Sequence, residues 1–469
     1  MSCRQRPSSA PLRPCAWLGL VAMAIAGTSA AAAVDSRARS FTLDNGLELV
    51  VIEDRRAPVV THMIWYRAGA ADDPPGKSGL AHFLEHLMFK ATGRFAPGEL
   101  SRLVAGLGGN DNALTSHDST LYYQRVAREH LATVMALEAD RMVDLRFTAE
   151  EVATERDVVI EERRQRIESS PLNALSEEIN SALYRGHPYA VPVLGWPQDI
   201  MRLDGEDARQ FYERYYAPDN AIVVVAGDVD AEVALELARA SYGHLPRRGA
   251  PATRTPASVT EPEHGQRIVR ADARVSAATF YRAYAVPGAA GVNGHEAETL
   301  EVLTRILAQG ETSRLHVRLV RNGRLAVSTE GGYRAATREA QIAIYAVGSR
   351  GIGPDGIESA IEAAIAELRD NGVTEAELER ARATIEAKHV FDSDSQLSLA
   401  MRYGEGLVTG RSIASIEGHA ERLAKVTRED VRAAAARYLD LRRAVTGWLL
   451  PAGVEARSAG GTQAGERDE

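Results

Sequence analysis

Cysteine is almost absent from this chain of 469 residues. The only two, Cys3 and Cys15, lie within its first 15 residues. The rest of the chain therefore forms no disulfide, and its stability must come from a packed core. A chain of this length buries such a core readily and is expected to form two domains or more. The same absence excludes thiolate ligands beyond residue 15, so any metal there must be held by histidines and carboxylates.

An excess of positive charge is also missing. The chain has 55 basic and 64 acidic residues, a net charge of −9. Such a balance argues against nucleic acid as a partner. Neither a basic patch nor a basic amphipathic helix indicates a membrane-surface protein. Basic peptides would suit an acidic surface, but the same charge is equally typical of an ordinary exported protein.

The chain has no apolar run of the length that favours a membrane-spanning helix. Near the N-terminus, three arginines precede a short apolar run at 17–26, and small residues follow at 29–33. This layout predicts a cleavable signal peptide over residues 1–33 and a periplasmic or secreted protein. The alternative is an uncleaved anchor.

The remaining sequence repeats itself at an offset close to 225 residues. Residues 373–380 echo 147–154, and 426–450 mirror 203–226. Such self-similarity predicts the duplication of a domain. Because each copy mixes hairpins with separated helices, we expect an α+β fold with two homologous domains. Each domain would hold a mixed, largely antiparallel sheet packed with helices.

The composition suggests where these domains begin and end. A segment rich in Pro, Arg, Ala and Thr predicts a linker between the copies, and the polar C-terminal end predicts a disordered tail. We expect an N-terminal domain at 34–245, a linker at 246–270, a C-terminal domain at 271–453 and a tail at 454–469. Within the first copy the pattern predicts a hairpin at 40–53 and a long charged helix at 148–167.

The sequence His82-Phe83-Leu84-Glu85-His86 carries the strongest chemical signal. On a helix, His82, Glu85 and His86 share one face. Two imidazoles so placed can clamp a zinc ion, with a carboxylate beside them to handle protons. The order H-x-x-E-H is the inverse of the commoner zinc-peptidase signature. The alternative is a chance pattern, since a histidine on an amphipathic helix is more often an ordinary surface or core residue.

A catalytic zinc site needs a third protein ligand from another element. Glu155 and Glu162, in the predicted helix 148–167, are seven residues apart and share a face, whereas Glu161 points elsewhere. The alternative is a solvated face with ion pairs such as Glu162 with Arg166. Spacing alone leaves both readings open.

Several motifs together resemble the pitrilysin/insulinase family of zinc metallopeptidases, especially its short two-domain bacterial members and the β subunit of mitochondrial processing peptidase. The resemblance covers essentially the whole chain after the signal and is strongest over 41–228. The segments that carry it are 82–90, Gly108-Gly109 with Asn112, Ala113 and Thr115, 118–122, 155–162, 187–189 and 215–221.

The resemblance implies a zinc-dependent endopeptidase with one zinc ion per chain. In that family the third ligand is a glutamate about 76 residues after the second histidine, which selects Glu162 here, and Glu155 would hold a ligand imidazole in orientation. Glu85 would be the general base that activates water. Substrate would add a strand at the edge near 112–115, with Asn112 and Ala113 in contact. Asn112 could instead be a simple turn residue.

The sequence departs from the family in its second copy. Active members usually carry an Arg followed six or seven residues later by a Tyr that helps to bind substrate. Here Arg321 is kept, but Val327 or Ser328 stands at the Tyr position, and Tyr333 is too far along. We therefore expect a homologous partner subunit without zinc ligands, or else a homodimer. The alternative function is a non-catalytic structural or peptide-binding subunit.

Overall fold

The computed structural model describes residues 37–249, 265–288, 291–292 and 294–453. The predicted signal peptide at 1–33, the tail at 454–469 and residues 250–264 of the predicted linker lie outside these ranges. Within them, no helix combines the length and the apolar character needed to cross a membrane.

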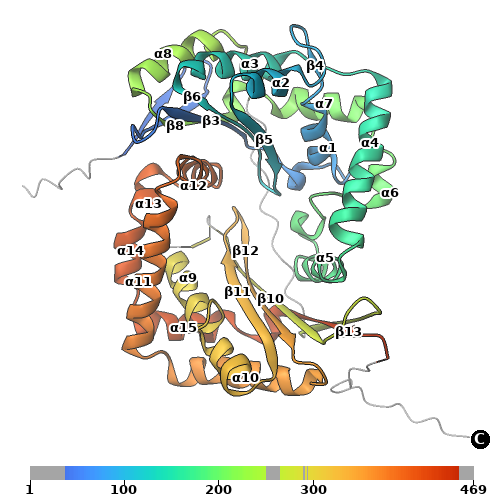
Figure 1. Cartoon of the computed structure of the whole chain (residues 1–469), viewed down its shortest axis with the longest axis vertical. Coiled ribbons are helices and arrows are strands. Elements are labelled where there is room, and N and C mark those ends of the chain that lie inside the picture. Colours follow the sequence, from blue (N-terminus) through green and yellow to red (C-terminus); the bar gives the residue numbers. More distant parts are fainter. Residues whose placement is uncertain (1–36, 250–264, 289–290, 293, 454–469) are drawn as a thin grey trace, which may run out of the picture. The chain divides into compact units, whose positions relative to one another are not determined.

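The first half is built on a six-stranded sheet in the order β1-β2-β8-β3-β6-β5 (Figure 1). The strands are β1 (Ala38–Thr42), β2 (Glu48–Glu53), β3 (Val59–Tyr66), β5 (Asn110–Thr115), β6 (Thr120–Ala127) and β8 (Ala221–Gly227). β1 and β2 form the predicted antiparallel hairpin, and β2 with β8 is the parallel pair of this sheet. β5 lies at the edge.

One apolar core joins this sheet to the helices on one of its faces. These helices are α1 (Leu80–Leu87), α2 (Glu99–Gly106), α3 (Leu131–Val143), α4 (Ala149–Arg163), α7 (Gly205–Tyr215) and α8 (Ala231–Tyr242). The other elements of this half include two short strands, a π-helical turn and two further helices: β4 (Ala91–Thr92), β7 (Leu145–Arg146), η3 (Arg164–Glu168), α5 (Pro171–Leu183) and α6 (Pro197–Ile200).

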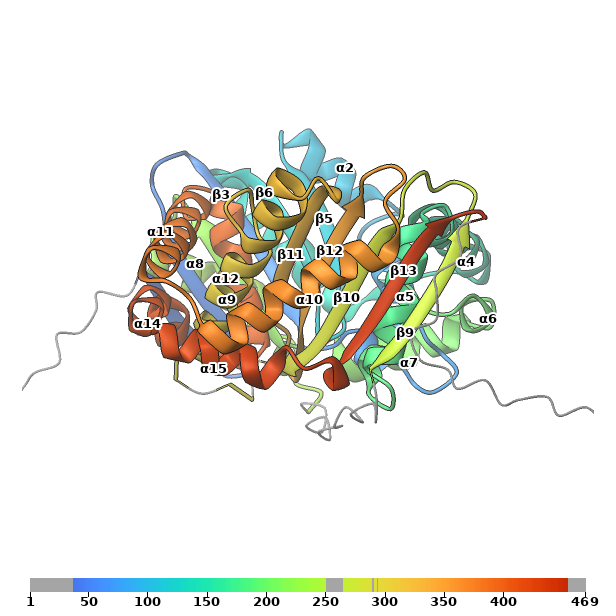
Figure 2. The same cartoon turned by 90° about the horizontal axis from the view of Figure 1, so that it is seen from below.

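The second half repeats this topology. Its five-stranded sheet has the order β11-β12-β10-β13-β9, seen from below in Figure 2. The strands are β9 (Gln266–Asp272), β10 (Thr279–Pro287), β11 (Ala326–Arg334), β12 (Glu339–Gly348) and β13 (Ala444–Pro451). The parallel pair β9 and β13 corresponds to β2 and β8. The mixed sheets, each largely antiparallel, confirm the predicted α+β fold with two homologous halves.

Strand β9 begins inside the segment predicted as a linker. Residues 266–270 pair with β13 instead of connecting the halves freely. Sequence reasoning placed this strand in the linker because its residues alternate polar and apolar only over a short run that directly follows the Pro- and Thr-rich stretch. The alternating exposure along β9 is typical of an edge strand with one face packed.

The second half contains seven α-helices within the described ranges. They are α9 (Glu296–Leu307), α10 (Pro354–Asn371), α11 (Glu375–Asp392), α12 (Gln396–Val408), α13 (Ile413–Glu417), α14 (His419–Lys425) and α15 (Arg428–Tyr438). A π-helical segment, η6 (His316–Asn322), precedes β11. α10 crosses one face of this sheet in Figure 2.

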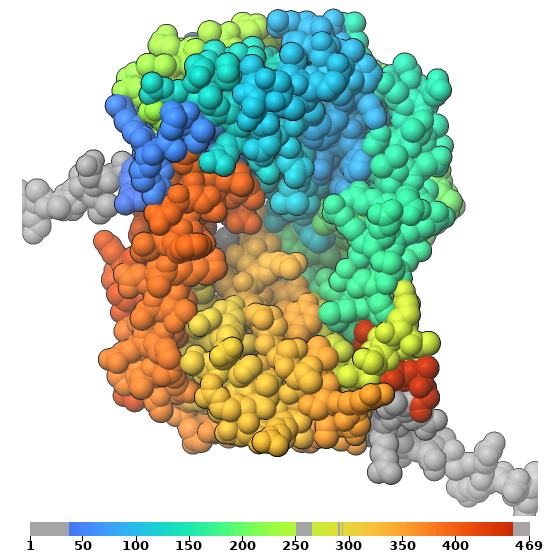
Figure 3. Space-filling model, in the orientation of Figure 1, coloured from blue at the N-terminus to red at the C-terminus, as the bar shows by residue number. Residues whose placement is uncertain are grey.

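The two halves exchange one helix each. α5 of the first half packs on β10 and β13, and α12 of the second half packs on β3 and β8. Polar contacts follow the same exchange: Arg56 pairs with Asp394 at 2.7 Å, and Gln396 donates to the Asp54 carbonyl at 3.1 Å. In Figure 3 the orange surface of this region meets the blue surface of the first strands.

Candidate metal centre

Helix α1 is held firmly at its first turn. Gly79, at φ 86°, begins it, and the Asp73 carboxylate accepts hydrogen bonds from the backbone amides of Gly79 (2.7 Å) and Ala81 (2.9 Å). A Cβ on Gly79 would lie 2.7 Å from the Leu194 carbonyl oxygen, so only glycine fits. The apolar residues of α1 are buried in the core. Because the apolar side of α1 is fixed in the core, the helix cannot rotate, and His82 and His86 stay turned toward α4.

Helix α4 supplies the opposing carboxylates. Thr148 and Glu151 form a reciprocal capping box at its start. Val152 and Val159 are buried and fix its rotation. Glu155 and Glu162 lie two turns apart on the side that packs against α1.

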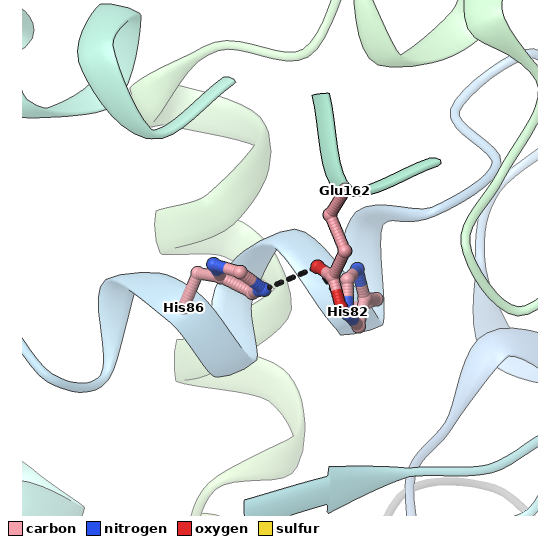
Figure 4. Close-up of side chains that lie close together, drawn as sticks. All are labelled: His82, His86 and Glu162. Carbon is pink, nitrogen blue, oxygen red and sulfur yellow. Dashed lines mark ion pairs between the residues drawn. The ribbon is translucent and has the colours of Figure 1, made fainter. Parts of the chain in front are cut away.

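Three side chains converge where α1 and α4 meet (Figure 4). One Glu162 oxygen, Oε2, lies 3.1 Å from His86 Nε2 and 3.5 Å from His82 Nε2. One potential ligand atom from each residue lies within 4.8 Å of the others. The second oxygen of Glu162, Oε1, forms an ion pair with Arg166 at 2.7 Å. This ion pair was the one expected if the helix face were simply solvated. In the structure Glu162 makes it with one oxygen and still approaches both histidines with the other.

The donor set fits a divalent metal ion. Glu162 Oε2 is buried and receives no hydrogen bond of good geometry from the described residues. Burial lowers the pKa of His82 to about 3, which leaves the imidazole neutral with a free lone pair. For His86, burial opposes the charge, but the contacts with Glu155 and Glu162 raise its pKa to about 9. Carboxylates that favour a proton at this point also favour a metal cation there.

Glu85 lies between this cluster and the edge strand. Its carboxylate accepts a hydrogen bond from the Thr115 hydroxyl at the end of β5. Burial raises the pKa of Glu85, although the Thr115 hydrogen bond works against that shift. A raised pKa makes this carboxylate a stronger proton acceptor, as a general base requires.

Glu155 binds the far side of one imidazole. Its Oε1 lies 2.9 Å from His86 Nδ1, and its Oε2 pairs with Lys90. The first contact fixes the ring so that Nε2 faces Glu162. Sequence reasoning gave Lys90 no role of its own and placed Thr115 only in the substrate edge, so their contacts with Glu155 and Glu85 are found only in the fold.

The structure separates the expected substrate residues into two groups. Asn112 and Ala113 lie on β5, whose outer edge is unpaired within the described residues, and Asn112 Oδ1 accepts the Ala113 amide at 2.9 Å. Arg321 is exposed on η6 of the second half, and its guanidinium donates to the Glu311 carbonyl at 3.5 Å. Among the described contacts, none joins Arg321 to the His-His-Glu group.

The second half presents no matching centre in its described residues. At the place that corresponds to the motif, Glu298 pairs with Arg422 at 2.8 Å and His295 with Asp430 at 3.1 Å. Tyr333 faces the core of this half, where burial raises its pKa to about 12. Val327 is exposed on β11. Tyr333 therefore does not take the place of the absent tyrosine.

Comparisons with known proteins agree with this division. Residues 49–196 match the family described as Insulinase (Peptidase family M16), and residues 202–385 match the Peptidase M16 inactive domain. The chain is 31% identical to the zinc protease PqqE of Helicobacter pylori over 372 residues, which cover 79% of this chain and 83% of that protein.

Two further relatives extend the comparison. A crystal structure of a protease from Helicobacter pylori has a TM-score of 0.83 and 28% identity, and the match covers 89% of this chain and 100% of that one. A probable mitochondrial-processing peptidase subunit beta of Schizosaccharomyces pombe is 29% identical over 209 residues, 45% of this chain and 46% of that protein. The chain belongs to the pitrilysin/insulinase (M16) family of zinc metallopeptidases and is of its short, two-domain type.

Proposed function

We propose that this chain is an exported zinc endopeptidase in which His82, His86 and Glu162 hold one zinc ion and Glu85 is the general base. The observation that carries the proposal is the approach of both histidine Nε2 atoms to one Glu162 oxygen beside the Glu85 carboxylate. Two imidazoles and one carboxylate are a common ligand set of catalytic zinc, which leaves a fourth position for water or substrate.

When bound, zinc supplies a Lewis acid that acidifies water and polarises a carbonyl group. The chain's own residues handle the proton. Glu85 accepts it from the attacking water and then delivers it to the nitrogen of the departing amine. Thr115 holds one oxygen of Glu85 in place. Glu155 keeps the His86 ring turned toward the metal position.

The peptide substrate binds as an added strand along β5. That strand ends at Thr115, beside Glu85, so a peptide paired with it passes the reacting groups. Main-chain hydrogen bonds to an edge strand give affinity for extended or unfolded peptides with little demand on their sequence. Asn112 and Ala113 are the residues of this edge that we expect to contact the peptide backbone.

A partner subunit would complete the site. No described contact joins Arg321 to the His-His-Glu group, and Tyr333 is half-buried against the core of the second half, so no Arg/Tyr pair beside the centre is among the described contacts. We favour a heterodimer with a homologous chain that lacks zinc ligands over a homodimer. The relative in Schizosaccharomyces pombe is itself named as a subunit. A purely structural or peptide-binding role is disfavoured because His82, Glu85, His86 and Glu162 are all present.

One experiment tests these proposals together. The wild-type chain and Glu85→Gln are purified, their zinc content is measured, and each is assayed on unfolded peptides alone and mixed with candidate partner chains. We expect one zinc per chain in both, chelator-sensitive cleavage by the wild type, and a loss of about 10²- to 10⁴-fold in Glu85→Gln. Cleavage by Glu85→Gln at the wild-type rate would contradict the base assignment, and full activity of the lone wild-type chain would contradict the need for a partner.

A further inference from the structure

A cavity of about 300 Å³ is lined partly by segments that continue from, or pack against, the elements of the candidate metal centre. Its apolar wall is formed by Ile167 and the segment 190–194. Polar residues of α5 form the second wall, and Arg334, the last residue of β11, stands at its rim. The cavity is large enough for one or two side chains of a peptide.

Three segments of the wall lead directly to residues of the centre. Ile167 is five residues after Glu162, on the turn η3 that continues α4. His117 is two residues after Thr115, the residue that binds Glu85, and its Nε2 lies 2.9 Å from the Val191 carbonyl. Leu194 packs against Gly79 at the start of α1. A peptide that passes Glu85 along β5 therefore continues toward this cavity.

The charged groups of the cavity leave a positive charge unmatched. Glu177 is neutralised by Arg163, with contacts of 2.9 and 2.6 Å. Arg334 makes no ion pair with a carboxylate of the described residues. Asn180 accepts a hydrogen bond from Gln341 on its carbonyl oxygen at 3.3 Å, so its NH₂ group remains as a donor. The cavity thus combines free donors with no free carboxylate.

We propose that this cavity is a substrate subsite that binds a carboxylate of the peptide, with Arg334 as the residue that determines this specificity. The inference rests on the proposed peptidase function, because it names the class of peptide that the same site prefers. The guanidinium matches a carboxylate in shape and charge, and Asn180 can donate to it as well. The carboxylate is that of an Asp or Glu side chain or of the peptide's C-terminus.

This preference would be local, since the protein as a whole is acidic. A net charge of −9 repels acidic peptides at long range. A single arginine without an ion pair in this cavity reverses that tendency at one position of the bound peptide. The expected result is a requirement for one acidic residue at a fixed distance from the cleaved bond, rather than a general liking for acidic peptides.

The test measures binding and cleavage with matched peptides. One set carries Glu, Gln or Lys at successive positions, and a second set has a free or an amidated C-terminus. Binding is measured by fluorescence anisotropy to zinc-loaded Glu85→Gln, which does not consume the peptide, and cleavage is measured as kcat/KM with the active protein. The variants are Arg334→Gln, Arg334→Glu and, as control, Arg350→Gln, an exposed arginine beyond the other end of β12.

We expect the preferred acidic peptide to bind about tenfold more tightly than its Gln counterpart. Arg334→Gln should remove the preference, Arg334→Glu should transfer it to the Lys peptide, and Arg350→Gln should preserve it. Loss of preference only for amidated peptides would identify the C-terminal carboxylate as the ligand. A preference that survives Arg334→Gln, or no preference at any position, would overturn the proposal.

The two proposals fail in different ways. If the chain binds peptides with the Arg334-dependent preference but never cleaves them, the subsite stands and the peptidase function does not. If it cleaves peptides with no such preference, the function stands and the subsite does not. Arg334 is exposed, so its variants are expected to fold normally.

Discussion

The candidate centre depends on three carboxylates that each have different partners. Glu162 meets both imidazoles, Glu85 meets Thr115, and Glu155 meets His86 and Lys90. Their environments differ enough to separate their chemistry: burial raises the pKa of Glu85, whereas contact with His86 lowers that of Glu162. A carboxylate with a lowered pKa remains ionised and suits cation binding. One with a raised pKa suits proton transfer.

The role of Glu155 in orienting His86 can be tested through zinc affinity, without a measurement of peptide cleavage. In Glu155→Gln the contact with His86 Nδ1 loses its charge, and Lys90 loses its ion pair. We expect zinc affinity to fall by about 10- to 100-fold, because a less firmly oriented imidazole is a poorer ligand. Affinity is measured by competition with a chromogenic chelator. The matched control is Glu161→Gln, an exposed glutamate of the same helix, and equal zinc affinity in both variants would refute the role of Glu155.

At the scale of elements, the two halves begin their long helices in the same way. Thr148 with Glu151 caps α4, and Thr374 with Glu377 caps α11. In the second half the capping carboxylate of Glu377 also binds an arginine. Arg314 binds Glu377 through two contacts, of 2.8 and 2.9 Å, and so ties α11 to the segment before η6.

This cap makes stability depend on pH in a defined window. Burial of Glu377 opposes its ionisation, but Arg314 and the Thr374 amide outweigh that effect and lower its pKa to about 2. Because the unfolded value is near 4.5, the ionised cap stabilises the folded state above pH 4.5 and loses its effect as the pH falls toward 2. We expect Glu377→Gln to lower the free energy of unfolding by about 2 kcal/mol at pH 7.

The difference between wild type and Glu377→Gln should shrink between pH 4.5 and 2. Urea unfolding at a series of pH values measures it. Glu379→Gln, an exposed neighbour on the same helix, should show no such trend. A difference that stays constant down to pH 2 would mean that the Arg314 contact does not depend on the charge of Glu377.

Much of this arrangement was predictable from the sequence, and the limits have physical causes. The hairpin of β1 and β2, the duplication and the edge position of β5 follow from local patterns and from the resemblance to a family. The approach of α1 and α4 was implied by the family resemblance, because spacing alone left it open, and the ligand roles of their residues remain predictions. Arg334 and Lys90 could not be found, because their roles arise from neighbours distant in sequence. The role of Arg321 also remains a prediction: its position in the chain suggested a substrate contact, and in the structure it lies exposed on η6.

At the scale of the whole described chain, the halves are joined by their exchanged helices. α12 contributes Leu399, Ala400 and Tyr403 to the apolar cluster on the face of the first sheet opposite that sheet's own helices. α5 makes the equivalent cluster on the second sheet. Each sheet therefore has one face covered by its own helices and the other by a helix from the opposite half. Neither half could bury all of its apolar surface alone.

Two glycines permit this exchange, and their replacement tests it. A Cβ at Gly404 of α12 would lie 2.1 Å from Trp65 Nε1, and one at Gly447 of β13 would lie 2.4 Å from the terminal methyl of Ile179 on α5. The Trp65 ring is buried and rigid, whereas the isoleucine methyl can rotate away. We expect Gly404→Ala to lower the free energy of unfolding by about 1–3 kcal/mol and Gly447→Ala by less. Denaturant titrations measure both against Gly106→Ala, whose Cβ would meet nothing within 4 Å and whose helical position should gain slightly in stability. Equal stability of Gly404→Ala and Gly106→Ala would show that α12 does not hold the halves together.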